Sequence, residues 1–481
     1  MAEGAVLEPD VHYGAAYLNA LSRALHHASA AQRRTDAKIV IVGHDAHMNG
    51  AQVLALNIGR TLRNRFGVKV SFILGDTGFL LDRYHAVGDV HIVRGGEARS
   101  IIGRLAKNGH TLAITNTTPA GRFVPALKAA GFTVVSLVHE LPNLLKSCGL
   151  DGPAGHISDE ADHVIFPAER VRQGFESFAG EVRNSAEIFP QGLFNADVLE
   201  IARGDHGVRA ELGLESNTRI VLGIGYADLR KGIDRFIATA LSICSKHDDV
   251  AFVWIGSPAS ETTHWFQPEI EASGLGNRIQ ILTPRKLARY YAAANAFYLA
   301  SREDPFPSVV LEALASGLPI IGHEGTGGCD DLIRRHGVLV PQTDPMAVTD
   351  AILDVISGQD PNAVEARRQE IARNYDFPDY VFGLIRRLAP HTATVSAVVP
   401  NYRYEAYVGE RLRSVFDQDY PLREVIVLDD ASPDNSVAEI ERTAEAAGRI
   451  IDLHVNETNS GSPFPQWRKG VELAQGGAVM A

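Results

Sequence analysis

The stretch "ASREDPFPSVVLEALASGLPII", residues 300–321, decides the fold of this chain. An apolar segment ends on the two acids Glu303 and Asp304, a proline-rich turn follows, and "SVVLEALASG" continues with a helical pattern. This order predicts a buried strand and then a helix whose first amides face whatever lies above the strand end.

The same alternation extends outward in both directions. Short apolar runs such as "KIVIVGHD", "RIVLGIGY" and "TVSAVVPNY" alternate with amphipathic segments, which predicts parallel βαβ units and doubly wound sheets. The series restarts twice, near residues 205 and 390. We therefore expect four parts: a helical lead-in (1–35), a first α/β domain (36–205), a second α/β domain (206–390) and a third α/β segment (391–481).

Charge and hydropathy exclude several classes of protein. The 481 residues carry a formal net charge of -12 and no long basic run, which argues against nucleic acid as a partner but leaves small phosphorylated ligands open. No apolar run approaches the roughly 20 residues that span a bilayer, and the N-terminus lacks the pattern of a signal peptide. The sequence predicts a cytoplasmic protein, either free or held peripherally at the inner face of a membrane.

Three widely spaced cysteines predict reduced core residues.

The helix start after Asp304 suits a phosphorylated ligand. Its unpaired amides and the helix dipole favour an anion, and Glu312, about one turn inside, has the chemistry to accept two ribose hydroxyls. A purely structural role explains the same residues, since acids at strand ends often cap helices and a Glu near a helix start offsets the dipole. Spacing alone leaves both interpretations open.

Basic residues follow another predicted strand end. In "VLGIGYADLRKGIDRFI", Arg230 and Lys231 stand between a glycine-rich strand and an amphipathic helix, where a diphosphate in a crevice needs cations. The alternative is a solvated turn, at which exposed charges contribute little.

In the first domain, Gly50 in "NGAQ" permits close backbone approach at a strand-to-helix turn, and His139 ends the strand "VVSLV". Turn chemistry and a structural histidine are the competing explanations for these two residues.

Residues 38 to 388 resemble the retaining family 4 glycosyltransferases. The resemblance rests on Asp304, seven residues and then Glu312, followed by "ALASGLPII", and on the pair Lys231 and Gly232 after a glycine-rich strand. Two positions depart from the family pattern: Asp304 stands where Glu is usual, and Tyr226 stands where Arg is usual.

The resemblance implies a GT-B fold of two Rossmann-like domains and a nucleotide-sugar donor. Glu312 would hold the ribose, while Asp304 or Glu303, with His139, would orient the donor sugar. The diphosphate would lie against Gly50, Arg230 and Lys231. Neither a cofactor nor a metal is expected for this module, because fixed positive charge replaces it.

The third segment collects polar residues at its predicted strand ends. Asn401 follows "TVSAVVP", and Asp429 and Asp430 follow "EVIVL", as a nucleotide crevice requires; a helix-capping turn in "SPDNS" is the competing explanation. The segment resembles family 2 glycosyltransferases of GT-A type, in which the second acid, here Asp430, reads the nucleobase. Its metal-binding Asp-x-Asp would follow residue 481, so we expect an incomplete module that would need a divalent metal only in its missing part, or else a structural remnant.

Together these features predict a glycosyltransferase for polysaccharide or cell-surface glycan synthesis. The expected donor is a UDP-, GDP- or dTDP-sugar, and the expected acceptor is a glycan or a lipid-linked glycan. A nucleotide-sugar epimerase or hydrolase would use the same donor site. A third hypothesis is an inactive nucleotide-sugar-binding scaffold for a partner transferase.

Overall fold

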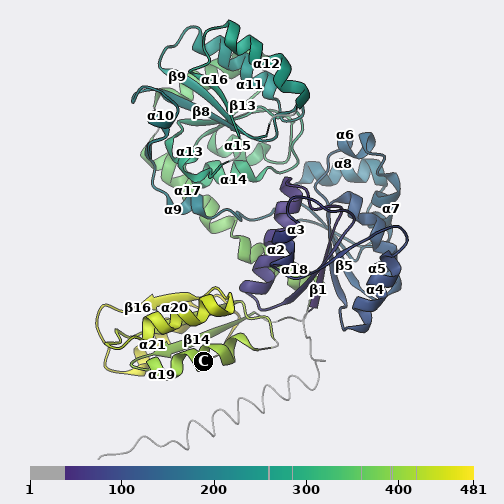
Figure 1. The fold of residues 1–481 in the computed structure, drawn as a ribbon, viewed down its shortest axis with the longest axis vertical. Coiled ribbons are helices and arrows are strands. Elements are labelled where there is room, and N and C mark those ends of the chain that lie inside the picture. Colours follow the sequence, from purple (N-terminus) through teal and green to yellow (C-terminus); the bar gives the residue numbers. More distant parts are fainter. Residues whose placement is uncertain are drawn as a thin grey trace, which may run out of the picture. The chain divides into compact units, whose positions relative to one another are not determined.

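The computed structural model describes residues 38–480, apart from residues 258, 259, 284, 359, 391, 393 and 419. The chain divides into two compact units (Figure 1). We call them the large unit, Ile39–Arg63 with Val70–Ala393, and the small unit, whose described part is Lys38, Asn64–Lys69 and residues 394–480 without residue 419. The predicted helical lead-in, residues 1–35, lies outside the described residues.

The first sheet of the large unit has seven parallel strands in the order β3-β2-β1-β4-β5-β6-β7. The order reverses between β1 and β4, and ligands of doubly wound sheets bind beyond the carboxyl ends of the strands at such a reversal. The strands are β1 (Lys38–Gly43), β2 (Lys69–Leu74), β3 (Asp89–Ile92), β4 (Leu112–Asn116), β5 (Thr133–Leu137), β6 (His163–Phe166) and β7 (Ser185–Ile188).

Helices connect these strands because apolar residues recur at helical spacing between them. In the helix after β1, for example, Leu54, Ile58 and Leu62 are buried. The connecting elements are α2 (Gly50–Asn64), α3 (Leu81–His85), α4 (Ala98–Lys107), the 3₁₀ helix η1 (Thr118–Phe123), α5 (Val124–Ala129), α6 (Pro142–Ser147), α7 (Asp151–Glu160) and α8 (Glu169–Ala179).

The second sheet has six parallel strands in the order β10-β9-β8-β11-β12-β13. Its strands are buried on both faces: Phe297 packs into one core and its neighbour Tyr298 into the other. Such burial explains the continuous apolar runs in the sequence. The strands are β8 (Arg219–Ile224), β9 (Val250–Ile255), β10 (Ile279–Leu282), β11 (Ala296–Leu299), β12 (Ile320–His323) and β13 (Val338–Val340).

Leu193 and Val198 are buried in the core of this second sheet. The chain therefore enters the second core before residue 205, where the sequence predicted the domain boundary. The helices of the second domain are α9 (Asp197–Glu200), α10 (Val208–Glu211), α11 (Ile233–Cys244), α12 (Ser260–Ala272), α13 (Ala288–Ala293), α14 (Ser308–Ala315), α15 (Asp330–His336), α16 (Pro345–Ser357) and α17 (Pro361–Asn374).

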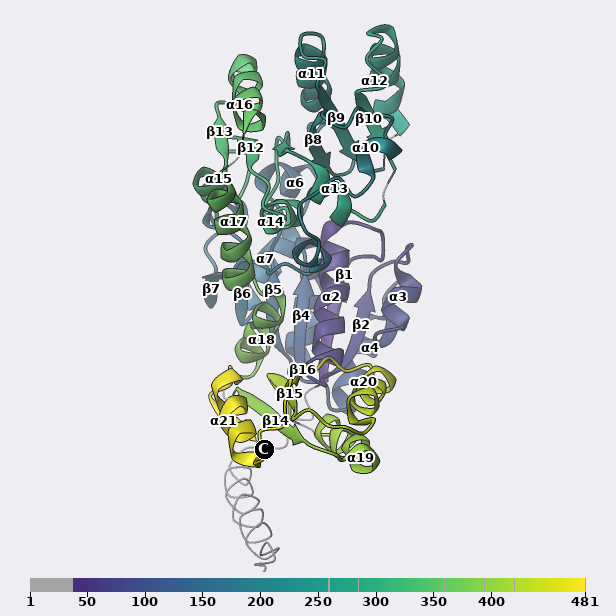
Figure 2. The ribbon, with the colours of Figure 1, turned by 90° about the vertical axis from the view of Figure 1, so that its left-hand side faces the viewer.

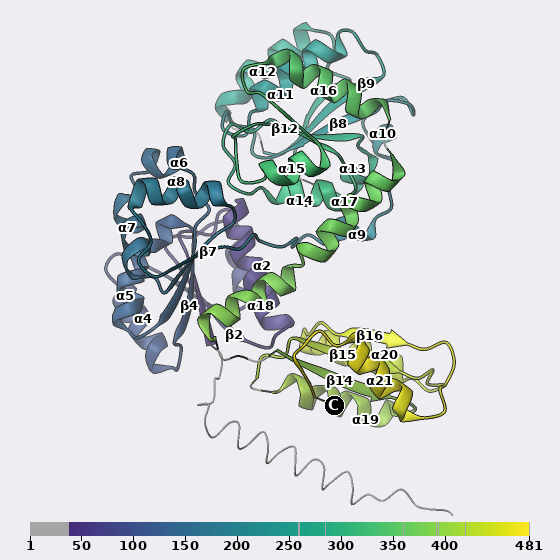
Figure 3. The same ribbon diagram turned by 180° about the vertical axis from the view of Figure 1, so that it is seen from behind.

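The last helix of the large unit, α18 (Phe377–Leu388), packs against β5 of the first sheet (Figures 2 and 3). Three successive helices start on an aspartate, since Asp344, Asp360 and Asp376 accept hydrogen bonds from the first amides of α16, α17 and α18. These caps satisfy amides that lack a partner within the helix.

The small unit has four parallel strands in the order β16-β15-β14-β17. Val399 and Val427 belong to a core with α19 and α20, whereas Val398 and Ile426 meet the end of α21. The strands are β14 (Val395–Asn401), β15 (Glu424–Asp429), β16 (Asp452–Val455) and β17 (Ala478–Met480); the helices are α19 (Glu405–Phe416), α20 (Ser436–Ala447) and α21 (Pro463–Leu473).

The cysteine prediction was wrong for one residue. Cys244 and Cys329 are buried free thiols, but Cys148 is exposed, because it follows the short helix α6 rather than lying within a packed element.

Candidate functional site

Lys231 and Asp304 form an ion pair at the carboxyl end of the second sheet. Lys231 lies between β8 and α11, and Asp304 follows β11, the neighbour of β8 in the sheet. Lys231 Nζ is 2.5 Å from Asp304 Oδ2, and Ser301 Oγ donates to the same oxygen at 3.1 Å. Because only 4% of Asp304 is exposed, its carboxylate depends on these partners rather than on water.

Glycines allow the loops around this pair to approach each other. Gly232 has φ 77°, and a Cβ there would lie 2.1 Å from the carbonyl oxygen of Ala300. A Cβ on Gly327 would lie 1.8 Å from the carbonyl oxygen of Asp304, whose amide donates to Thr326 O at 2.9 Å. Any side chain at either glycine would push Lys231 and Asp304 apart.

Glu312, on α14, is a buried carboxyl group with partners of its own. The hydroxyl of Tyr291 donates to Glu312 Oε2 at 2.9 Å. Burial raises the pKa of Glu312 to about 7, although hydrogen bonds from Tyr291 and Asn195 act in the opposite direction. Sequence reasoning missed Tyr291 and Asn195, and nothing in the sequence distinguishes Tyr291 from an ordinary core aromatic residue.

Arg230 and Glu303 lie beside the ion pair with contacts of their own. Arg230 Nη1 donates to the carbonyl oxygen of Glu303 at 3.1 Å. The carboxylate of Glu303 accepts a hydrogen bond from the amide of Asn143, at 3.3 Å, in the first domain. Tyr226, at the position where the family pattern has Arg, is half-exposed. The Arg230 side chain is therefore held by the backbone of Glu303, the residue before Asp304.

Gly50 and His139 lie at the carboxyl end of the first sheet. Gly50 is the first residue of α2, and a Cβ there would meet open space. His139 follows β5, and its Nε2 is 3.1 Å from Asn116 Oδ1 at the end of β4. Burial lowers the pKa of His139, against the opposing charge of Glu140, so the imidazole is neutral at pH 7. Asn116 was missed, although it too ends a predicted strand.

In the small unit, Asp429 is the last residue of β15 and Asp430 follows it, and both are buried. Asp429 accepts from Asn401 Nδ2 at 2.6 Å and from the amide of Ser432 at 2.8 Å. Residues 456–466 close on Asp430, whose carboxylate accepts hydrogen bonds from Asn456, from Ser460 through its amide and hydroxyl, and from Gln466.

These contacts change how Asp430 would read a nucleobase. Burial acts to raise the pKa of Asp430, but hydrogen bonds from Ser460, Asn456 and Gln466 outweigh it and hold the pKa below its usual range. An arriving base would have to displace at least one of these donors. Base reading by Asp430 therefore stays a prediction.

Replacing Asp430 by alanine should loosen residues 456–466. The variant removes the charged acceptor of several hydrogen bonds, each worth about 1.5 to 3 kcal/mol, so amide hydrogen exchange in 456–466 should accelerate at least tenfold. Exchange measured by mass spectrometry checks this, with the exposed Glu472 near the end of α21 replaced by alanine (Glu472→Ala) as the control. Unchanged protection would mean that other contacts hold the segment.

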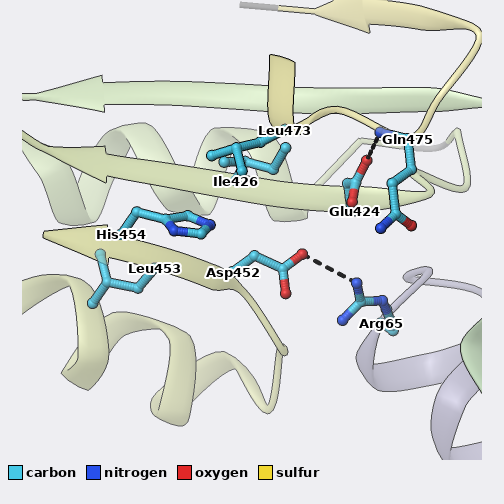
Figure 4. Close-up of a pocket in the computed structure, with 8 residues that line it drawn as sticks. All are labelled: Arg65, Glu424, Ile426, Asp452, Leu453, His454, Leu473 and Gln475. Carbon is cyan, nitrogen blue, oxygen red and sulfur yellow. Dashed lines mark hydrogen bonds and ion pairs between the residues drawn. The ribbon is translucent and has the colours of Figure 1, made fainter. Parts of the chain in front are cut away.

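The cavity drawn in Figure 4 has a volume of about 400 Å³, and neither Asp429 nor Asp430 lines it. Two of its lining residues, Glu424 and Asp452, begin β15 and β16, whereas Asp429 and Asp430 lie at the carboxyl end of β15. Its other lining residues are Arg65, Ile426, Leu453, His454, Leu473 and Gln475. The cavity is therefore not the predicted nucleotide site.

Two segments of the chain match known protein families. Residues 207–375 match the family "Glycosyl transferases group 1", and residues 396–480 match "Glycosyl transferase family 2". The chain carries two glycosyltransferase domains. The group 1 domain contains Lys231, Asp304 and Glu312, and the family 2 domain contains Asp429 and Asp430.

Relatives and solved structures agree with this assignment. A D-inositol 3-phosphate glycosyltransferase of Nocardia farcinica is 27% identical over 213 residues, covering 42% of this chain and 46% of the relative. An alpha-galactosylglucosyldiacylglycerol synthase of Streptococcus pneumoniae is 28% identical over 161 residues, covering 30% of this chain and 41% of the relative. The chain thus spans about half the length of the curated relatives it matches.

Solved structures share the fold. Alr3699/HepE of Anabaena in complex with UDP aligns with a TM-score of 0.61 at 18% identity, over 73% of this chain and all of that one. WaaG, a glycosyltransferase of lipopolysaccharide biosynthesis, aligns with a TM-score of 0.58 at 13% identity, over 73% of this chain and 99% of that one. The large unit has the GT-B fold, as the family 4 resemblance predicted.

Within residues 38–480 as described, no helix combines the length and apolar character needed to cross a membrane. In the same part of the chain, no three His, Cys, Asp or Glu side chains gather as metal ligands would. The expectations about metals and about peripheral membrane association stay predictions.

Proposed function

We propose that the large unit transfers a sugar from a nucleotide diphosphate to a hydroxyl group of a glycan or lipid-linked acceptor. We further propose that the transfer retains the anomeric configuration and serves polysaccharide or cell-surface glycan synthesis. The observation that carries the proposal is the ion pair of Lys231 and Asp304 at the carboxyl end of one sheet, with the buried carboxyl group of Glu312 on the helix that follows Asp304, in a group 1 glycosyltransferase domain.

The reaction creates charge where this site supplies the opposite charge. The bond between the sugar C1 and the diphosphate oxygen breaks, and the diphosphate leaves with the electron pair. The acceptor oxygen bonds to C1 and gives up its proton, which the leaving diphosphate oxygen takes up. Lys231 and the first amides of α14 would stabilise the leaving diphosphate, and a fixed donor or charge of this kind is worth about 10²- to 10³-fold in rate.

The remaining residues would orient the donor. Glu312 would accept the ribose hydroxyls, while Asp304 or Glu303, with His139, would hold the sugar. Gly50 and Arg230 would complete the diphosphate subsite, in which fixed positive charge takes the place of a metal. UDP-sugars are the first donors to test, because the structurally similar HepE was solved with UDP and with UDP-glucose.

Product analysis tests the proposal. The full chain would be incubated with UDP-, GDP- and dTDP-sugars, with and without a panel of glycan and glycolipid acceptors. We expect release of the nucleoside diphosphate together with a glycosylated product, and both only when an acceptor is present. The anomeric proton coupling of the product reports retention.

Each hypothesis that competes with transfer predicts a different result. Release of the nucleoside diphosphate without acceptor would indicate a hydrolase, and an isomerised nucleotide sugar would indicate an epimerase. Donor binding without turnover across the panel would favour a scaffold. Any of these results would overturn the proposed transfer.

A further inference from the structure

We propose that Asn116 is a positioning residue for His139: its side-chain amide fixes the imidazole with the proton on Nε2 and leaves Nδ1 to accept a hydrogen bond from the donor sugar. The proposal rests on the proposed function for the identity of that ligand. The hydrogen bonds themselves do not depend on it.

The orientation of the Asn116 amide follows from its two partners. Asn116 Nδ2 lies 2.8 Å from the carbonyl oxygen of Ala51, which can only accept a hydrogen bond. The nitrogen must therefore face Ala51, and Oδ1 must face the imidazole of His139, at 3.1 Å from Nε2. Because an amide oxygen can only accept, Nε2 has to carry the proton.

This assignment determines which ring nitrogen serves a ligand. Among the described residues, Nδ1 of His139 has no hydrogen-bond partner, and the residue, although largely buried, keeps some exposed surface. Asn116 itself is 2% exposed, so it reaches a ligand through His139 rather than directly. Rotation of the ring by half a turn would break the bond to Asn116, so this bond fixes the position of Nδ1.

The backbone beneath the ring is held separately. Glu140 Oε2 accepts hydrogen bonds from the amide of His139 at 3.2 Å, and from the amide and hydroxyl of Thr118 at 3.0 and 2.6 Å. Glu140 thus fixes the main chain where β4 and β5 end, and Asn116 fixes the side chain. Asn116 also joins the ring to the first turn of α2, which begins at Gly50.

A binding cycle with UDP and UDP-glucose tests the proposal without an acceptor. We expect Asn116→Leu and His139→Ala each to weaken UDP-glucose binding five- to tenfold and to leave UDP binding within twofold. Because Asn116 acts through His139, adding Asn116→Leu to His139→Ala should weaken UDP-glucose binding by less than twofold more. If Asn116→Leu weakened UDP-glucose binding as much in His139→Ala as in the original chain, the proposal would be overturned, because a merely structural role of Asn116 does not depend on His139.

A matched control removes a neighbouring buried hydrogen bond. Thr115 precedes Asn116 on β4, and its Oγ1 is 2.7 Å from Ser136 Oγ on β5. Thr115→Val breaks that bond without touching the imidazole, so we expect UDP-glucose binding within twofold of the original chain. A loss as large as that of Asn116→Leu would mean that general loosening of the strand ends explains the effect.

A spectroscopic measurement separates failure of this inference from failure of the proposed function. In the full chain with ¹⁵N-labelled histidine, the Nε2 proton of His139 should be visible, because its hydrogen bond slows exchange. It would be assigned by its absence in His139→Gln, and it should disappear in Asn116→Leu. A signal that persists in Asn116→Leu overturns the inference even if UDP and UDP-glucose do not bind, whereas loss of the signal without binding counts against the proposed donor alone.

Discussion

Replacing Lys231 by alanine should lower kcat/KM for sugar transfer by at least about a hundredfold. The variant removes the cation beside the leaving diphosphate, and loss of one fixed group that stabilises developing charge costs about 2.7 to 4 kcal/mol in the transition state. The measurement is initial rates of nucleoside diphosphate release with the best donor and acceptor from the product screen. Lys246→Ala, an exposed lysine of the same domain, is the control and should retain full activity.

Stability has to be separated from chemistry in this variant. Lys231→Ala leaves the buried carboxylate of Asp304 without its cation, and breaking a buried pair in this way costs about 3 to 5 kcal/mol. The double variant Lys231→Met with Asp304→Asn leaves no unpaired charge, so its thermal stability should recover while its activity does not. Recovery of activity together with stability would show that Lys231 acts only in folding.

Glu312 should make nucleotide binding depend on pH near neutrality. Burial raises its pKa to about 7, so the carboxyl group is mostly protonated at pH 6 and mostly ionised at pH 8. Ribose hydroxyls donate more strongly to a carboxylate than to a neutral acid, so UDP affinity should rise about tenfold from pH 6 to pH 8. Calorimetry across this range measures the effect, and Glu312→Gln should weaken binding and flatten the profile. A wild-type profile as flat as that of Glu312→Gln would remove Glu312 from the ribose site.

The same carboxyl group should reduce stability at high pH. Its pKa is about 7 in the folded chain and 4.5 as a model value, so between these pH values the folded state binds more protons than the unfolded state. The free energy of unfolding should therefore fall as pH rises from 4.5 to above 7, by about 3 kcal/mol in total. Urea unfolding of Glu312→Gln should lack this contribution and show higher stability than the original chain at pH 8.

Much of the architecture could be predicted because it is encoded locally. The runs that became β8, β9 and β11 are continuous and apolar because they are buried on both faces, and their amphipathic neighbours could only be crossover helices. The boundary near residue 205 was less accurate, since Leu193 and Val198 belong to the second core and short connecting segments carry little periodicity.

The candidate site was predicted only in part. Strand ends that carry Lys231, Asp304 and His139 could be identified, because chemistry in parallel sheets gathers there. Tyr291 could not be recognised, since its hydroxyl meets Glu312 across 21 residues of sequence and only burial shows that the contact matters. The segment that covers Asp430 was missed for the same reason: its donors lie 26 to 36 residues further along the chain.

The sequence by itself determined the three α/β series, the strand ends and the spacing of Asp304 and Glu312, because periodicity and turn chemistry depend on neighbouring residues. Only the tertiary structure decided that Lys231 pairs with Asp304, that Glu312 titrates near neutrality and that Asn116 orients His139. Pairing, desolvation and tautomer choice arise from groups distant in the chain, so they exist only once the strands lie side by side.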